Sequence, residues 1–194
     1  MERHVIKTVS CREAYELMCR LTAEQGAVRN LHLDIRLEPW LVETELFPGE
    51  ALAAYSAWNL ELPIEPALRE KYFSAHRGGS QGDYRDGMRA KIDNVVDCLT
   101  HFPASKRAVI IVPNESMPSH RDDAAAKCMR ELHYYLEGDV LNATVLFRAQ
   151  AAEIFPKNIH FIGELVAEVA RRLPGDVRPG TLHYLTTILV ADRW

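Results

Sequence analysis

Cysteine thiols are the side chains of this sequence best suited to covalent chemistry, and it contains four: Cys11, Cys19, Cys98 and Cys128. They are widely spaced and form no Cys-x-x-Cys pair, so they indicate neither a zinc site nor a disulfide framework, and we expect no metal. A thiol attacks as its thiolate, which requires positive charge nearby. At most one of the four needs such a role, because a lone cysteine in a strand is also an ordinary small hydrophobic residue.

Two further polar residues are candidates for holding a ligand. Arg148 ends the apolar run 145–147, where a charge needs a partner, and a guanidinium fork fits two oxygens of an anion. We therefore interpret Arg148 as an anion-binding residue. Asn158 offers one acceptor and two donors through its amide, but it also opens a segment of helical periodicity. An N-cap role explains Asn158 equally well, so both roles stay open.

The composition is that of an ordinary globular chain of one domain, 1–194. It has 194 residues, of which 47% are hydrophobic and 26% charged. No segment is apolar and long enough to cross a bilayer, and the first ten residues lack the apolar stretch of a secretory signal, so we expect a cytoplasmic protein without a membrane partner. The net charge of -4 argues against binding to nucleic-acid polymers, which requires a basic surface.

Hydrophobic periodicity predicts the elements that position these residues. Helices are expected at 11–24, at 50–75 with a break near Pro63, at 86–101 and at 158–173. Strands are expected at 31–37, 108–112, 126–136, 140–148 and 181–190, with a further extended piece at 40–46. The segment 77–83 predicts a mobile loop, and residues 137–139 predict a tight hairpin. Since strands and helices are interleaved without strict alternation, the pattern indicates an α/β or α+β fold.

Several segments, in the same order and at nearly constant spacing, resemble the thymidylate synthase family over residues 84–190. Residues 84–89 (YRDGMR) have the frame of the family's Tyr-Gly-x-x-Trp-Arg, and 102–112 are similar to its Asn-Pro-Asp-Ser-Arg-Arg followed by an apolar strand. Residues 124–128 (AAAKC) stand where the family has a short apolar lead into Pro-Cys-His. Arg148 falls at the arginine of Gln-Arg-Ser, and 155–159 match the Pro-Phe-Asn-Ile entry to a long helix.

The resemblance implies a fold and an assembly. The expected fold is a thymidylate synthase-like mixed sheet with packed helices, in which 1–83 are a divergent N-terminal part and 84–194 the family-like core. The expected assembly is a homodimer formed by packing sheets face to face, which would partly bury the run 108–112 between subunits.

The resemblance also implies roles for the matching residues. Cys128 would be the nucleophile that adds to C6 of a pyrimidine nucleotide, Arg148 would bind the phosphate, and Asn158 would contact the pyrimidine edge. The remaining implied substrate contacts are with Tyr84, with His183 and Tyr184 near the family's His-x-Tyr, and with Lys106 and Arg107 reaching from the neighbouring subunit.

Alternatives accompany the weaker of these matches. Lys106 and Arg107 are equally explained as two solvated charges before a strand. The match at His183 and Tyr184 lacks one residue of the family's spacing, so a core-facing strand position is the alternative for at least one of them.

The departures from the family pattern concern the one-carbon step. Met129 replaces the His after the cysteine, Ala149 replaces a phosphate-binding Ser, and Ala151 stands where the family has an Asp that orients folate and substrate. The family's Glu-Leu-Leu-Trp-Phe-Leu stretch is absent, and Trp194 precedes the expected place of its closing tail. Because each lost acid–base group costs roughly 10²–10⁴-fold in rate, ordinary thymidylate synthesis is not expected. His133 and Met129 are an even number of residues apart in the predicted strand, so both should point to the same face. His133 should therefore point away from Cys128.

Three hypotheses follow. The first is a specialised transferase that uses Cys128 on a pyrimidine nucleotide or related anionic metabolite, with C5 methylation or hydroxymethylation by methylenetetrahydrofolate as the reaction to test. The second is a folate-independent, Cys-dependent transferase or hydrolase acting on another substrate. The third is a non-catalytic ligand-binding dimer. Part of the site could also lie in residues 1–83, where the polar side chains of one predicted strand face either a pocket or solvent: Arg29, His32, Asp34 and Arg36.

Overall fold

The computed structural model describes residues 6–72, 82–115, 119, 121 and 126–192. Its helices are α1 (Cys11–Gln25), α2 (Gly49–Asn59), α3 (Pro66–Tyr72), α4 (Met88–His101) and α5 (Phe155–Arg172), with a short 3-10 helix, η3 (Ala152–Ile154), before α5. Its strands are β1 (Ile6–Ser10), β2 (Ala27–Arg36), β3 (Val109–Ile111), β4 (Met129–Glu137), β5 (Val140–Phe147), β6 (Gln150–Ala151) and β7 (Arg178–Val190).

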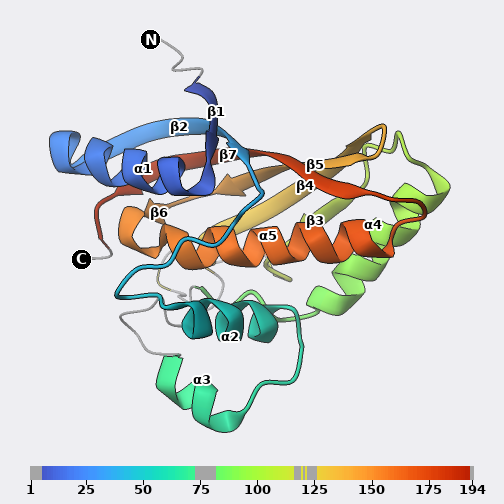
Figure 1. Ribbon diagram of the computed structural model, residues 1–194, viewed down its shortest axis with the longest axis horizontal. Helices are drawn as coiled ribbons and strands as arrows, with labels where there is room; N and C mark the ends of the chain where they lie inside the picture. Colours follow the sequence, from blue (N-terminus) through green and yellow to red (C-terminus); the bar gives the residue numbers. More distant parts are fainter. Residues whose placement is uncertain (1–5, 73–81, 116–118, 120, 122–125, 193–194) are drawn as a thin grey trace.

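The strands form one mixed sheet, which confirms the predicted α/β class. The strand order is β1-β2-β7-β5-β4-β3, and the short β6 pairs with β7 (Figure 1). The pairs β1–β2, β5–β7 and β6–β7 are parallel, and the remaining pairs are antiparallel. The long strand β7 therefore lies centrally and joins the N-terminal strand β2 to the hairpin β4–β5.

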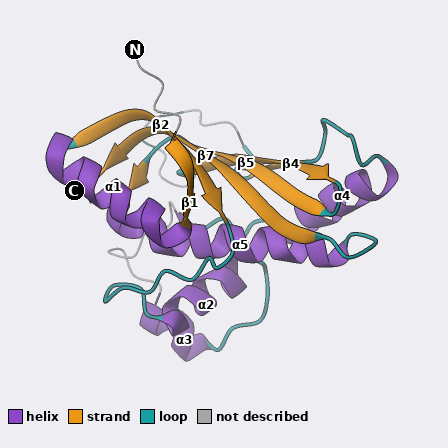
Figure 2. Cartoon of the chain, turned by 45° about the horizontal axis from the view of Figure 1, so that its top comes forward, coloured by secondary structure: helices purple, strands orange, loops and turns teal. Residues whose placement is uncertain are grey.

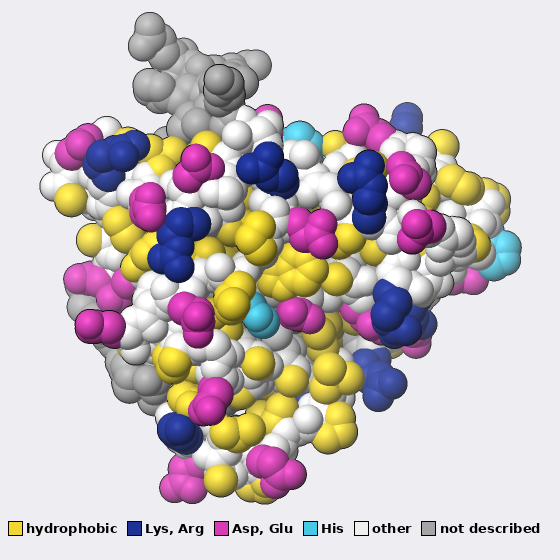
Figure 3. All heavy atoms as spheres, viewed as in Figure 1, with side chains coloured by type: hydrophobic (Ala, Val, Ile, Leu, Met, Phe, Trp, Pro, Cys, Tyr) yellow, Lys and Arg dark blue, Asp and Glu magenta, His cyan; other side chains and the backbone are white. Residues whose placement is uncertain are grey.

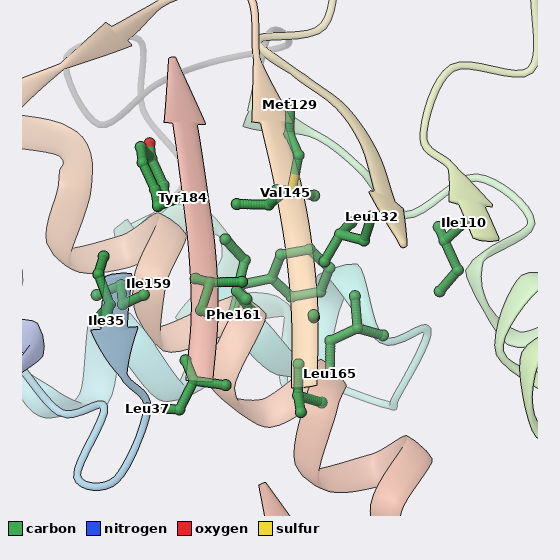
Figure 4. Packing of buried hydrophobic residues seen from close by; sticks show 14 of the residues in the cluster. Ile35, Leu37, Ile110, Met129, Leu132, Val145, Ile159, Phe161, Leu165 and Tyr184 are labelled. Atoms are coloured by element: carbon green, nitrogen blue, oxygen red, sulfur yellow. The ribbon is translucent and has the colours of Figure 1, made fainter. Parts of the chain in front are cut away.

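In the described part of the chain, the helices lie on one side of this sheet and leave its other face open (Figure 2). Helix α5 runs across the covered face, and α2 and α3 form a further layer beyond α5 (Figures 1 and 2). Figure 4 shows Phe161 and Leu165 of α5 among Ile35, Leu132 and Val145 of the strands, and all five side chains are fully buried. The hydrophobic core is thus the layer between the sheet and α5.

Local sequence signals account for most element boundaries. The Ser10 side chain accepts a hydrogen bond from the Glu13 backbone N–H, and the Glu13 carboxylate accepts one from the Ser10 N–H at 2.7 Å, so a capping box starts α1 at the residue predicted from the sequence. Gly138, with φ of 63°, provides the left-handed residue of the predicted hairpin between β4 and β5. The predicted break near Pro63 separates α2 from α3.

Other expectations need correction. The segment 40–46 is not a strand: Trp40 instead packs on Gly163 of α5, and its indole N–H donates to Glu164 at 3.0 Å. Strands β1 and β6 were not predicted, and β2, α5 and β7 begin three or four residues before their predicted starts. The predicted loop 77–83 lies outside the described residues except for Gly82 and Asp83.

The side-chain directions predicted for β4 are wrong, because a β-bulge interrupts the strand. The register of β4 against β5 shifts between Met129 and Glu131, so one residue is inserted there. Met129 is fully buried, and so is Leu132, whereas the side chain of His133 is 51% exposed. His133 and Met129 therefore lie on opposite faces, and His133 lies on the open face of the sheet.

None of the helices in the described part of the chain has the length and apolar character needed to span a membrane. On the side of the molecule that carries α5 and α2, basic and acidic side chains are interspersed among hydrophobic ones (Figure 3). That face presents mixed charge instead of a single basic patch.

Candidate functional site

Cys128 lies directly before β4, at the end of the sheet where β4 and β5 meet the start of α5. Its carbonyl accepts a hydrogen bond from the Arg148 N–H at 2.9 Å, which joins the two chain segments beside the thiol. Burial raises the pKa values of Tyr55 and Tyr184 well above their ordinary value, and the nearby Tyr84 and Cys128 raise both further. The Cys128 thiol therefore lies within electrostatic range of buried tyrosines from α2 and β7.

Arg148 holds the segment that leads into Cys128. Its Nε donates to the carbonyls of Ala126 and Lys127 at 3.2 Å, and its Nη2 donates to that of Ala126 at 2.5 Å. The charge that ends β5 thus has partners within the chain. These contacts use Nε and Nη2, and a guanidinium carries five N–H donors, so Nη1 has the chemistry to bind an anion.

A hydrogen-bonded chain of side chains connects β6, α5 and β7. The Asn158 Nδ2 donates to Gln150 Oε1 at 2.9 Å, and the Tyr184 hydroxyl donates to the same oxygen at 2.5 Å. Gln150 Nε2 in turn donates to the Ala151 carbonyl at 2.5 Å. Because a carbonyl oxygen only accepts, this last contact fixes the orientation of Gln150 and therefore that of Asn158.

This orientation leaves one buried acceptor. Asn158 is only 4% exposed, and its Oδ1 has no hydrogen-bond partner in the described structure. Buried polar atoms are nearly always hydrogen-bonded, since an unpaired one costs roughly 1–3 kcal/mol. Asn158 Oδ1 is thus available to accept a hydrogen bond from an N–H or O–H group of a ligand. The predicted N-cap role does not apply, because Asn158 lies inside α5, which begins at Phe155.

Lys157 is a site residue that the sequence analysis missed. Its side chain is 2% exposed, and its Nζ lies 4.6 Å from the centroid of the Tyr55 ring. A Cβ at Gly82 would lie 2.6 Å from that Nζ, so the glycine permits a close approach of backbone and ammonium. The helix dipole disfavours a lysine in the first turn of a helix. This unfavourable position is the feature of the sequence that could have identified Lys157.

Aromatic rings form the walls around these polar groups. Tyr84 is 2% exposed and packs on Phe161 with ring centroids 5.9 Å apart, and the Tyr55 hydroxyl donates to the Gly82 carbonyl at 2.5 Å. A cleft of about 430 Å³ adjoins this cluster, and Asp83, Tyr84, Arg85 and Lys127 are among the residues lining it. The cleft meets the cluster at Tyr84, and Lys127, the neighbour of Cys128 in the chain, also lines it.

The structure brings together Tyr84, Cys128, Arg148, Asn158 and Tyr184 of the predicted site, but not His183. Asp34 binds the Nδ1 of His183, and this residue lies on the open face of the sheet, opposite Tyr184. Adjacent strand residues point to opposite faces, so these two cannot replace the family's His-x-Tyr, whose members are two apart and share a face.

Lys106 and Arg107 also lie away from Cys128 within one chain. Both are exposed and sit in the connection between α4 and β3. Arg107 lines a surface hollow together with Phe102, which is 69% exposed. One chain alone therefore does not place these two charges at the cluster around Cys128.

No protein-family model matches this chain, and no curated protein does.

Proposed function

We propose that this chain is an enzyme of the thymidylate synthase superfamily that uses Cys128 as a nucleophile on a pyrimidine nucleotide or a related anionic small molecule. The observation that carries the proposal is the buried, unpartnered Asn158 Oδ1 in the same cluster as Cys128, Tyr84 and Tyr184. A pyrimidine supplies the missing donor, N3–H in uracil or the 4-amino group in cytosine.

Each residue of the cluster has its own role in the proposed reaction. The Cys128 thiolate adds to C6, and the electron pair of the C5–C6 bond moves toward C5 and the exocyclic oxygen or nitrogen at C4. Tyr184 and Gln150 keep Asn158 in its binding orientation, because burial holds the Tyr184 hydroxyl in its neutral, donating form. Lys157 contributes a buried amino group, and Arg148 Nη1 is a guanidinium donor whose chemistry suits a phosphate oxygen.

Folate fits this site poorly. The family's folate-orienting Asp is Ala151 here, whose half-buried methyl side chain offers no hydrogen bond, and the residue after the nucleophile is the fully buried Met129. We therefore derive no step through folate. These two residues also favour a second function, in which the same thiol acts on its substrate without methylenetetrahydrofolate.

Self-association is part of the proposal. The open face of the sheet carries Ile111 at 59% and Leu185 at 36% exposure, and in the described residues no helix covers it. Packing two such faces together would form the homodimer that the resemblance implies. In such a dimer, Lys106 and Arg107 would be available to a partner's site.

The test is mass spectrometry of the intact protein after incubation with a panel of uracil and cytosine nucleotides, with and without methylenetetrahydrofolate. We expect a nucleotide adduct or a C5-modified product that disappears in Cys128→Ser and persists in Cys98→Ser, which removes another half-buried thiol. Dependence on folate would identify a methylase or hydroxymethylase, and turnover without it would identify the second function. Adducts that form equally in Cys128→Ser would refute the nucleophile, and no adduct in any mixture would favour a non-catalytic binding dimer.

Asn158→Ala tests the acceptor separately. Removing a buried hydrogen bond to a ligand costs about 1–3 kcal/mol, which corresponds to roughly 5–150-fold weaker nucleotide binding. Equal nucleotide affinity in wild type and Asn158→Ala, measured by calorimetry, would show that this amide does not contact the ligand.

A further inference from the structure

A second polar cluster lies on the open face of the sheet, on the side opposite Cys128. Among the residues that the structure describes, His32, Asp34 and His183 are the group whose ligand atoms lie within 4.8 Å of one another. Asp34 pairs with His183 in the antiparallel register of β2 and β7, and His32 precedes Asp34 by two residues. The strand pleat therefore points all three side chains out of the same face.

The distances within this cluster approach those of a metal site. His183 Nδ1 lies 2.6 Å from Asp34 Oδ1, and His32 Nε2 lies 3.6 Å from the same oxygen. Ligand atoms around a tetrahedral zinc ion are about 3.4 Å apart, given metal–ligand bonds of about 2.0–2.2 Å. A widening of the Asp34–His183 contact by less than 1 Å, together with an approach of His32 and His183, whose ligand atoms lie within 4.8 Å, would give these distances. The side chains of Asp34 and His183 are 28% and 30% exposed.

Tyr135 adjoins this cluster, and its hydroxyl can adapt to the change of His183 tautomer that metal binding requires. Its hydroxyl lies 2.8 Å from His183 Nε2. Without metal, Nδ1–H of His183 donates to Asp34, and Nε2 accepts from the hydroxyl. With metal on Nδ1, the ring proton moves to Nε2, which then donates to the same hydroxyl. A hydroxyl can do both, and a partner on the second ring nitrogen is the usual way in which a metal-binding histidine is oriented.

We propose that His32, Asp34 and His183 bind one divalent transition-metal ion of the zinc class, with solvent in the fourth position. Two imidazoles and one carboxylate suit this class, whereas Mg²⁺ and Ca²⁺ prefer sites built from oxygen ligands alone. The three ligands come from one chain, so we expect one ion per chain. This proposal does not rest on the proposed chemistry of Cys128, because its residues lie on the opposite face of the sheet.

The experiment titrates Zn²⁺ into the tag-free, chelator-treated full-length protein against a chromophoric competitor, and records the visible spectrum of the Co²⁺ complex. We expect one ion per chain, a cobalt spectrum of nitrogen and oxygen ligands without a thiolate charge-transfer band, and no response to Mg²⁺. His32→Ala, Asp34→Ala and His183→Ala should each weaken Zn²⁺ binding at least about 100-fold, and Tyr135→Phe roughly 10-fold.

Two variants serve as controls. His133→Ala removes another exposed histidine of the same sheet face, and Cys128→Ser removes the half-buried thiol of the other site; both should bind Zn²⁺ like the wild type. The circular dichroism of each metal-free variant establishes that it is folded. The proposal is overturned by wild-type affinity in the three ligand variants, by loss of binding in Cys128→Ser, or by the absence of Zn²⁺ binding at micromolar concentrations.

Discussion

Cys128 and Cys11 differ in burial, which separates the proposed reactive thiol from a structural one. Burial raises the pKa of Cys11 to about 12, and its Sγ lies 3.5 Å from the carbonyl oxygens of Arg36 and Leu37. Cys128 is only partly buried, and its carbonyl accepts a hydrogen bond from the Arg148 backbone N–H. Access to the sulfur is one of the conditions under which a thiol reacts.

Alkylation should therefore distinguish the two thiols. At pH 8 we expect iodoacetamide to modify the half-buried Cys128 at least about 100-fold faster than Cys11, because Cys11 is fully buried and its thiolate population falls tenfold for each unit by which burial raises its pKa. Peptide mapping by mass spectrometry gives both rates in one sample. Equal protection of Cys128 and Cys11 would remove the case for a nucleophile.

Replacing a buried tyrosine by phenylalanine should have opposite effects on the free energy of unfolding at two positions, Tyr184 and Tyr134. The Tyr184 hydroxyl bonds to Gln150, whereas the Tyr134 hydroxyl is buried without a hydrogen-bond partner in the described structure. Tyr184→Phe should lower the free energy of unfolding by about 1 kcal/mol, and Tyr134→Phe should leave it unchanged or raise it by a similar amount. Urea unfolding measures both, and a stabilised Tyr184→Phe would contradict the chain that orients Asn158.

At the scale of elements, the packing of α5 decides where the site lies. The helix faces the sheet on one side and α2 on the other, and its N-terminus carries Lys157 and Asn158. Two contacts on its length fix its position: Gly163 against Trp40, and His160 against Ser56 of α2, where Nδ1 and Oγ are 2.7 Å apart. Both contacts yield predictions.

Gly163→Ala should destabilise the fold. A Cβ at Gly163 would lie 2.2 Å from Trp40 Cγ, so the ring and its hydrogen bond to Glu164 must move, at a cost of about 1–3 kcal/mol. Denaturant unfolding measures the effect. In a Trp40→Leu background the same substitution should cost much less, and an undiminished cost there would place the strain elsewhere in α5.

His160 should make stability depend on pH. Burial lowers its pKa below the ordinary 6.5, although Glu164 opposes this shift. Because the unfolded state then binds the proton more readily, this contribution is present above pH 6.5 and is lost as pH falls through the folded-state pKa.

The comparison of wild type with His160→Gln isolates that contribution. Urea unfolding between pH 8 and pH 5 should show wild type losing stability relative to the variant on acidification. A difference that is independent of pH would show that His160 does not titrate differently in the two states.

At the scale of the whole molecule, the one-sided layering is the main feature. Helices cover one face of the sheet, while the other face presents apolar side chains beside the proposed metal ligands. Apolar residues exposed on a sheet face that no described helix covers favour association between copies.

Light scattering should therefore give a mass of about twice the 22.0 kDa chain. Ile111→Lys, on the open face, should shift the protein toward a monomer, whereas Leu41→Lys should not, although Leu41 is similarly exposed at 49%. A wild-type monomer at all concentrations would contradict the proposed assembly and weaken the proposed family membership with it.

The sequence by itself determined the features that depend on neighbouring residues: the capping box at Ser10, the hairpin at Gly138, the period of α4 and α5, and the candidate residues Cys128, Arg148 and Asn158. Each signal lies within a few residues, where propensity and periodicity act. Only the tertiary structure decided the β4 bulge, the face of His183 and the burial of Lys157. Asp34 and His183 are 149 positions apart, and the register of β2 against β7, which no local pattern specifies, places them in contact.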